Sequence, residues 1–245
     1  MRVPFRIWGV FTIFLAVASL KIIFFPSAYI EGDGDLVSGV SREGFRLNPS
    51  SPPEDVITLR VLVAADEEYR KRMDVMGAGW REEALMVLER ADDAFYRDFG
   101  INFAATGFVE WDSPNEESDG VTLLIAAQSD LGWGQGRDGH DILLVFTGQD
   151  IKDYAGWAEH YYGSRDADTV ILQHQFDLWR RNKDWHVLQG ELSHLFGASD
   201  HVSPSDPIYW REDIMSYKWL YYTDKWDALC SKIIQKNRER FSKIS

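Results

Sequence analysis

Cysteine is almost absent from this chain of 245 residues, which contains Cys230 alone. One cysteine permits no internal disulfide and excludes a zinc site built from several cysteines. Any metal is therefore expected to be held by His, Asp, Glu or Tyr, and Cys230 is expected to be a small buried residue of the last helix. Basic residues are also scarce, since 26 Lys and Arg stand against 39 Asp and Glu and leave a net charge of −13. Nucleic-acid binding needs a basic surface, so we expect no nucleic-acid partner.

The N-terminal segment is typical of an export signal. Arg2 and Arg6 precede an apolar stretch, residues 7–30, that contains one lysine. A basic start followed by an apolar segment directs export, and about 24 residues are long enough to span a bilayer. We interpret residues 1–30 as an uncleaved signal anchor, with a cleaved signal peptide as the alternative. The protein is then a single-pass membrane protein with an extracytoplasmic domain, or is secreted after cleavage.

The remainder of the chain divides into a linker and one domain. Residues 31–55 are rich in Gly, Ser, Pro and acidic residues, which predicts a linker. Residues 56–245 are long enough to bury a sizeable core. We therefore expect one globular domain there, held off the membrane by the linker.

Hydrophobic periodicity in that domain predicts strands and helices. Apolar residues alternate over 56–64, as in a strand, and helical spacing over 80–99 ends at Gly100. The nearly all-apolar run 141–147 predicts a central strand buried on both faces. Further predictions are strands at 101–111 and 168–175, a helix capped by Asp184 and running to Phe196, a last helix capped by Thr223 or Asp224, and an ambiguous segment at 121–127. The first strand–helix–strand unit favours a mainly parallel sheet covered by helices.

The stretch at residues 190–201 carries most of the functional information. It reads G-E-L-S-H-L-F-G-A-S-D-H and follows the zinc protease pattern H-E-x-x-H-x-x-G-x-x-(H/D) in all but the first position. On a helix, Glu191 and His194 share a face. A zinc protease holds its ion with imidazoles or carboxylates, leaves one position open to water, and uses a carboxylate to take that water's proton. The spacing therefore predicts Glu191 as the general base and His194 as a metal ligand.

The end of the same helix predicts the third ligand. Gly197 allows a left-handed turn that returns the chain toward His194. Asp200 stands at the spacing of the third metal ligand, and His201 is an alternative one residue further along. The pattern leaves open which of the two binds the metal.

Together with residues 214–217, I-M-S-Y, this stretch resembles the metzincin clan of zinc metallopeptidases. The resemblance implies an α+β fold with a mixed, mainly parallel twisted sheet, an active-site helix, a methionine turn and a C-terminal helix. It implies zinc as the cofactor and structural roles for Gly197 and Met215. It also implies that Tyr217 assists the metal or the oxyanion.

Two finer resemblances concern individual branches of the clan. Aspartate is the third ligand in snapalysin-like members, which favours Asp200. Residues 146–158 are similar to the strand and bulge of adamalysin-like members, in which the following edge strand pairs with an extended substrate. The bulky residues 219–222 are expected to pack around the methionine turn, or to form the wall of a substrate subsite.

The departure from the pattern is Gly190, which stands where the first histidine ligand belongs and has no side chain to bind metal. Glycine inside a helix also costs about 1 kcal/mol relative to alanine. Ligation of one ion by His194, Asp200 and His201 together would restore three protein ligands. His174, on the preceding strand, is a less favoured substitute.

Two functions follow from these residues. The first is a membrane-tethered, extracytoplasmic zinc metalloendopeptidase, in which metal-bound water hydrolyses a peptide or protein substrate with Glu191 as the general base. The second is a catalytically impaired pseudoprotease that binds an extended peptide or a protein partner, because Gly190 lacks the first metal ligand. A non-catalytic metal-binding surface domain is a third, less favoured interpretation.

Overall fold

The computed structural model describes residues 55–114, 119–134, 139–152, 155–163, 167–174 and 183–241. The signal anchor or signal peptide predicted at residues 1–30 lies outside the described residues, and so does the linker predicted at residues 31–55, apart from Asp55. Within the described ranges, no helix is both long enough and apolar enough to cross a membrane.

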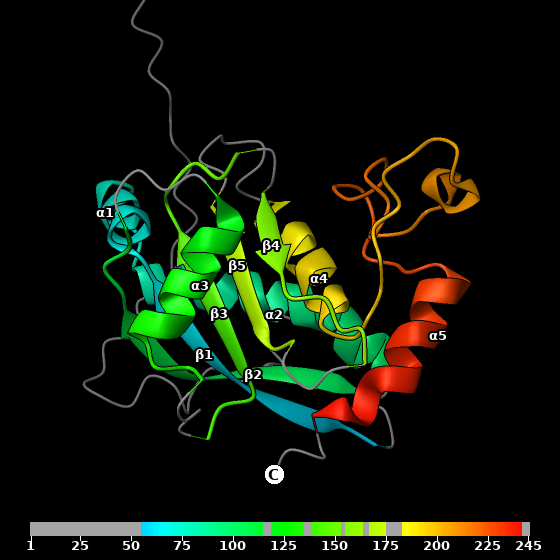
Figure 1. Cartoon of the computed structure of the whole chain (residues 1–245), viewed down its shortest axis with the longest axis horizontal. Helices are drawn as coiled ribbons and strands as arrows, with labels where there is room; N and C mark the ends of the chain where they lie inside the picture. The colour runs from blue at the N-terminus through cyan, green and yellow to red at the C-terminus, as the bar shows by residue number, and fades with distance from the viewer. Residues whose placement is uncertain are drawn as a thin grey trace, which may run out of the picture. The chain divides into compact units, whose positions relative to one another are not determined.

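A five-stranded sheet forms the centre of the domain (Figure 1). Its strands are β1 (Ile57–Ala65), β2 (Ile101–Glu110), β3 (Ile142–Thr147), β4 (Gly156–Ala158) and β5 (Thr169–Gln173), in the order β2-β1-β3-β5-β4. The first four strands of that order are parallel to one another, whereas the edge strand β4 runs antiparallel to β5. The expectation of an α+β fold with a mixed, mainly parallel sheet is confirmed.

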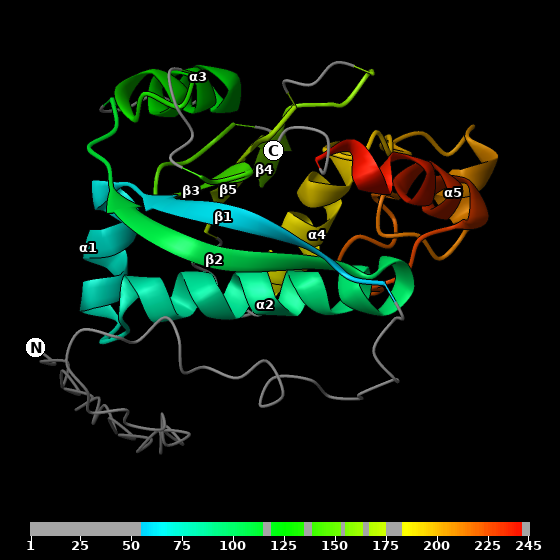
Figure 2. The same cartoon turned by 90° about the horizontal axis from the view of Figure 1, so that it is seen from below.

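Helices cover both faces of the sheet (Figure 2). They are α1 (Glu67–Val75), α2 (Trp80–Phe99), α3 (Gly120–Asp130), α4 (Asp184–His194) and α5 (Ala228–Asn237), with short 3-10 helices at Pro207–Trp210 and Arg238–Arg240. Figure 2 shows α2 along one face and α3 along the other. Successive side chains of a strand point to opposite faces. Accordingly, Leu144 of β3 packs in the cluster that contains α2 and α4, while Leu143 and Val145 pack against α3.

The strongest sequence patterns match the structure. All six residues of β3 are buried, as predicted for a central strand. The helix predicted at 80–99 is α2, and Gly100 ends it with a left-handed φ of 63°. The ambiguous segment at 121–127 is helical because the Asp119 carboxylate accepts a hydrogen bond from the Thr122 N–H and so caps α3.

Two predicted helix starts are wrong. The helix α4 begins at Asp184 instead of being capped by it, and it ends two residues before Phe196. The cap of α5 is Asp227, whose carboxylate accepts hydrogen bonds from backbone N–H groups of the first turn. Thr223 and Asp224 do not cap this helix, because their side chains bind residues elsewhere in the chain.

The helix α1 escaped prediction because its apolar pattern is weak. Only Tyr69 and Met73 of this helix are buried. Its start is instead set by Asp66, whose carboxylate accepts a hydrogen bond from the Tyr69 N–H at 2.7 Å.

An aromatic cluster joins the sheet to the C-terminal part of the domain. Phe95 of α2 is fully buried, and its ring lies 5.1 Å from that of Phe103 in β2 and 6.0 Å from that of Phe196, just after α4. Trp226, before α5, completes the cluster at 4.8 Å from Phe95. Phe95 therefore links the sheet to the segment after α4 and to the segment before α5.

Truncation of Phe95 tests this packing. We expect Phe95→Ala to lower the free energy of unfolding by about 3–5 kcal/mol, because it removes a fully buried ring. Val75→Ala is the control, since Val75 is 88% exposed and its truncation should change stability by less than about 0.5 kcal/mol. Denaturant unfolding of the full chain, followed by tryptophan fluorescence, measures both values. Equal losses in the two variants would contradict the packing.

Candidate active site

Hydrogen bonds from the segment before α5 fix the rotation of α4. The Trp226 indole N–H donates to Ser193 Oγ at 2.9 Å, and that hydroxyl donates to the Gln189 carbonyl at 2.7 Å. The Gln189 amide donates in turn to the Asp224 carbonyl at 2.8 Å. These bonds hold the side of α4 that carries Gln189 and Ser193. The side that carries Gly190, Glu191 and His194 therefore faces a pocket.

The pocket has a volume of about 200 Å³ and lies between α4, β4 and the chain around the methionine turn. It is lined by Ala155, Gly156, Val187, Gly190, Glu191, His194, Asp200, Ile214, Tyr217, Leu220 and Tyr221. Five site residues predicted from the sequence are among them, including the vacated position 190. Leu220 and Tyr221 form part of its wall, as in the subsite interpretation of residues 219–222.

A left-handed glycine returns the chain to the pocket. Gly197 follows α4 with a φ of 90°, and its N–H donates to the His194 carbonyl at 2.9 Å. A Cβ at this position would lie 3.0 Å from the Tyr161 carbonyl oxygen. Both the conformation and the lack of space favour glycine here. This geometry agrees with the structural role expected for Gly197.

The turn brings Asp200 to His194. Asp200 Oδ1 lies 3.3 Å from His194 Nε2, and His194 Nδ1 lies 2.8 Å from the Ala198 carbonyl oxygen, to which it donates. The carbonyl therefore leaves Nε2 as the nitrogen that faces the pocket and Asp200. A backbone partner of this kind fixes the ring orientation of metal-binding histidines in general.

The charges of the pocket depend on one another. Burial alone lowers the pKa of His194, but the hydrogen bond to Asp200 and the charge of Glu191 outweigh burial and raise this pKa to about 9. Burial raises the pKa of Glu191 to about 7, against the effect of the charged His194. In the absence of a cation, His194 therefore carries a proton and pairs with Asp200.

Glu191 is packed tightly against the edge strand. A Cβ on Gly156 of β4 would lie 2.9 Å from Glu191 Cγ, closer than side-chain atoms approach one another. Glycine at 156 thus lets the glutamate side chain lie directly beside the backbone of β4. This arrangement places a carboxyl group at the edge where the sheet ends.

The structure does not bring His201 to this group. His201 forms a parallel bridge with Ser216, and its N–H donates to the Met215 carbonyl at 2.8 Å. Neighbouring side chains of an extended chain point to opposite sides, so Asp200 faces the pocket and His201 faces the interior. His201 Nδ1 binds Asp206 at 2.7 Å instead. The hypothesis that His194, Asp200 and His201 share one ion does not fit this geometry.

The methionine turn expected at residues 214–217 stays a prediction, but the structure shows where Met215 and Tyr217 lie. Met215 is 1% exposed and packs in the core with α4. Tyr217 is 49% exposed and lines the pocket. The role predicted for the Tyr217 hydroxyl in stabilising an oxyanion stays a prediction, as does that of Glu191 as a base.

His174 and His160 do not replace the missing ligand. His174 pairs with Asp184 at the start of α4, and both side chains are fully buried. His160 lies close to the pocket residues, with its ring centroid 5.2 Å from that of His194, but its Nε2 is 3.2 Å from Ser199 Oγ. Sequence reasoning did not include His160 in the site. The sequence feature that could have indicated His160 is its position two residues after the edge strand β4.

Comparison with known families accords with this geometry. The model of metallo-peptidase family M12, Reprolysin_5, matches residues 57–215, which run from β1 through α4 to Met215. The chain belongs to metallo-peptidase family M12. Among curated proteins, no match to the chain was found.

A solved structure shares the fold of this M12 domain. It is titled "Structure of a chaperone-substrate complex", and its matching chain has a TM-score of 0.56 and 10% sequence identity. The match covers 77% of this chain and 36% of that chain, so the M12 chain spans about a third of the length of its structural relative. At this identity the likeness concerns the fold alone.

The pocket does not hold the donor set of a catalytic zinc site. Such sites have three protein ligands and one open position. His194 and Asp200 provide two donor atoms, and Gly190 provides none. Within the described ranges, the one group of three His, Cys, Asp or Glu donors close enough to share an ion lies elsewhere, around His201. The zinc that the family implies is therefore not matched by the residues of this pocket.

The two glycines of the motif are expected to respond oppositely to alanine. At Gly190 a Cβ would meet only Leu220 Cδ1, at 3.6 Å, so Gly190→Ala should raise the free energy of unfolding by about 1 kcal/mol through helix propensity. At Gly197 the φ of 90° and the Tyr161 carbonyl oppose a side chain, so Gly197→Ala should lower it by about 1–3 kcal/mol. Thermal and denaturant unfolding of both variants measure the signs. A loss in both would contradict the open space at position 190.

Proposed function

We propose that this M12 protein is a pseudoprotease, which binds an extended peptide segment of a substrate or partner protein without efficient hydrolysis. The observation that carries the proposal is Gly190, which lines the pocket where a metal ligand is needed and leaves two donors for any ion. Two protein ligands hold zinc more weakly than the three found in catalytic sites. We further propose that the apolar segment 7–30 tethers the domain to the extracytoplasmic side of a membrane.

The edge strand supports peptide binding. Ala155 and Glu159 direct backbone hydrogen bonds inward to β5, and Trp157 pairs with Ile171 between them. Backbone groups alternate in direction along an antiparallel strand. The N–H and C=O groups of Gly156 and Ala158 thus point away from β5, toward the side on which a peptide strand would add.

The pocket wall indicates which side chain it accepts. Val187, Ile214 and Leu220 contribute apolar surface, and the missing side chain at Gly190 adds volume beside them. An apolar side chain of the bound segment fits this surface best. The extended segment would then be held by backbone hydrogen bonds along β4 and by one buried apolar side chain.

Slow hydrolysis is the second candidate function. It is favoured by Glu191, whose pKa is raised to about 7 and which lines the same pocket as the His194–Asp200 pair and Tyr217. A carboxyl group with that pKa is suited to proton transfer near neutral pH.

Restoring the missing histidine separates the two functions. Positions 190 and 194 are one helical turn apart, and the space at 190 admits a side chain. Gly190→His in the full, detergent-solubilised chain should bind about one more equivalent of Zn²⁺ than the native chain. It should also cleave a mixed peptide library at least about 100-fold faster than the native chain. Loss of a residue that only supports a metal ligand already lowers activity by about 10- to 100-fold, so gain of a ligand should have at least this effect.

The controls make this comparison specific. Gly190→Ala fills the same space without a donor and should gain neither metal nor activity. Adding Glu191→Gln to Gly190→His should remove cleavage but leave the extra zinc in place. Cleavage by the native chain at the rate of Gly190→His would refute the pseudoprotease proposal in favour of hydrolysis.

Peptide addition to β4 is tested by Ala158→Pro. Proline removes the outward N–H of Ala158 but none of the inward bonds to β5, and proline is tolerated at such edge positions. We expect about tenfold weaker binding of fluorescent peptides selected from the library on the native chain, which is the effect of about 1.4 kcal/mol. Fluorescence anisotropy measures the affinity, and thermal unfolding checks the fold.

The matched control is Ile125→Ala. Ile125 is an exposed residue of α3, which covers the face of the sheet opposite to α2. It should leave the affinity unchanged. Undiminished binding by a folded Ala158→Pro variant would exclude β4 as the docking edge.

A further inference from the structure

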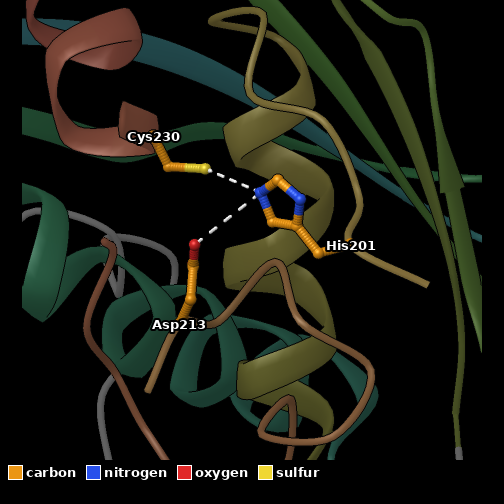
Figure 3. A group of neighbouring side chains, drawn as sticks. All are labelled: His201, Asp213 and Cys230. Carbon is orange, nitrogen blue, oxygen red and sulfur yellow. Dashed lines mark hydrogen bonds and ion pairs between the residues drawn. The ribbon is translucent and has the colours of Figure 1, made fainter. Parts of the chain in front are cut away.

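A second group of donors lies in the interior, behind the methionine turn. His201, Asp213 and Cys230 each direct one ligand atom to a common point, and the three atoms lie within 4.8 Å of one another (Figure 3). The Cys230 Sγ lies 3.5 Å from His201 Nε2, and Asp213 Oδ2 lies 3.9 Å from the same nitrogen. All three side chains are buried, with exposures of 7%, 0% and 1%.

The histidine of this group is oriented as a metal ligand would be. His201 Nδ1 lies 2.7 Å from Asp206 Oδ2 and donates a hydrogen bond to this carboxylate. With Nδ1 bound to Asp206, Nε2 is the ring nitrogen that faces Cys230 and Asp213. Metal-binding histidines commonly donate their second nitrogen to a carboxylate in this way.

The aspartate contains an unsatisfied atom. Asp213 Oδ1 accepts a hydrogen bond from the Met215 N–H at 2.9 Å. Its other oxygen, Oδ2, is buried and accepts no well-formed hydrogen bond within the described residues, apart from the weak thiol donor of Cys230. Leaving a buried carboxylate oxygen unpaired is costly. A cation between Oδ2, the sulfur and the imidazole nitrogen would satisfy it.

We propose that His201, Asp213 and Cys230 form a structural site for a thiophilic divalent cation such as Zn²⁺. A thiolate, a carboxylate and a neutral imidazole carry two negative charges in total, which match the charge of the cation. Bond lengths to zinc predict about 3.6 Å between tetrahedral N and S ligands and about 3.4 Å between N and O. The observed N–S distance of 3.5 Å agrees with the first value, and the observed N–O distance of 3.9 Å is longer than the second, so Asp213 would move slightly inward on binding. A water molecule would complete four-coordination.

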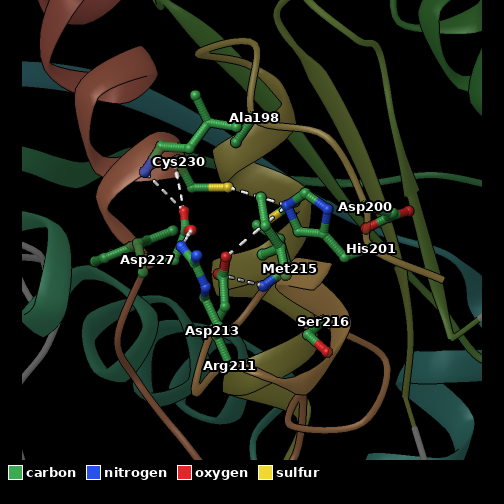
Figure 4. Close-up of polar contacts among 12 residues, drawn as sticks. Ala198, Asp200, His201, Arg211, Asp213, Met215, Ser216, Asp227 and Cys230 are labelled. Carbon is green, nitrogen blue, oxygen red and sulfur yellow. Dashed lines mark hydrogen bonds and ion pairs between the residues drawn. The ribbon is translucent and has the colours of Figure 1, made fainter. Parts of the chain in front are cut away.

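The neighbouring carboxylate is not a fourth ligand. Asp227 lies next to Cys230 (Figure 4), but its Oδ1 accepts hydrogen bonds from the backbone N–H groups of Leu229 and Cys230. Its Oδ2 accepts one from Arg211 at 3.2 Å. Asp227 instead holds the first turn of α5, and with it Cys230, in position.

The site would join three segments that are distant in sequence. His201 follows the turn after α4, Asp213 opens the methionine turn, and Cys230 lies on α5. An ion bound by all three would hold the C-terminal helix and the methionine turn to the wall of the pocket. Its role is therefore stabilisation, since metal-binding free energy adds to folding free energy.

Cobalt and zinc titrations of the full native chain, solubilised in detergent and stripped with a chelator, test this site. One equivalent of Co²⁺ should produce a thiolate-to-cobalt charge-transfer band, which only Cys230 can supply because it is the one cysteine. Zn²⁺ should displace the cobalt. At about 1,000 times its dissociation constant, Zn²⁺ should raise the Tm by on the order of 10 °C.

Two variants assign the signal. Cys230→Ala should abolish the band and the zinc-dependent rise in Tm, whereas His194→Ala, in the pocket, should leave both unchanged. Absence of the band in the native chain would overturn the proposal, as would metal content and Tm shifts that persist in Cys230→Ala. If Cys230→Ala does not fold, the native titration decides alone. Failure here leaves the pseudoprotease proposal intact, because that rests on the extra equivalent bound by Gly190→His.

Discussion

The pairing of the chain after α4 with the methionine turn is the constraint on which the two donor groups depend. The parallel bridge between His201 and Ser216 holds this segment extended. Extension sends Asp200 to one side and His201 to the other, so a single backbone contact separates the pocket from the interior cluster. A shift of the pairing by one residue would exchange the two side chains. Met215, whose carbonyl accepts the His201 N–H beside this bridge, is buried in the core.

The pocket combines a complete structural frame with an incomplete donor set. The frame consists of Gly197, which needs its left-handed φ, and Gly156, which lets Glu191 approach the edge strand. Both glycines are required by contacts with backbone or side-chain atoms. Gly190 is different, because nothing in its surroundings requires the absence of a side chain. Contacts thus explain the glycines at 156 and 197, whereas no contact explains the glycine at 190. The sequence alone does not distinguish these cases.

Much of the fold could be predicted from patterns that act over a single element. The all-apolar run of β3 is enough to predict a buried strand, and the helical spacing of α2 is enough to predict a helix. The starts of α4 and α5 were mispredicted because several polar residues compete for a cap, and tertiary contacts of Thr223 and Asp224 settle the competition. Within the site, the motif spacing brought Glu191, His194 and Asp200 together correctly. The separation of His201 from Asp200 depends on a partner strand that is distant in sequence, which local spacing does not reveal.

The proposed interior site departs from the expectation that any metal is held by His, Asp, Glu or Tyr alone. One cysteine builds no multi-cysteine site, yet a thiol beside an imidazole and a carboxylate offers a mixed donor set. These residues are 12 and 17 positions apart in sequence, from His201 to Asp213 and from Asp213 to Cys230. Only the packing of α5 against the methionine turn makes them neighbours.

The open space beside Gly190 has a further consequence. Because a side chain there would meet Leu220 at ordinary contact distance and no backbone atom, residue 190 can change without compensating changes in its neighbours. One substitution at position 190 can therefore change the donor set of the pocket while the packing around it stays in place.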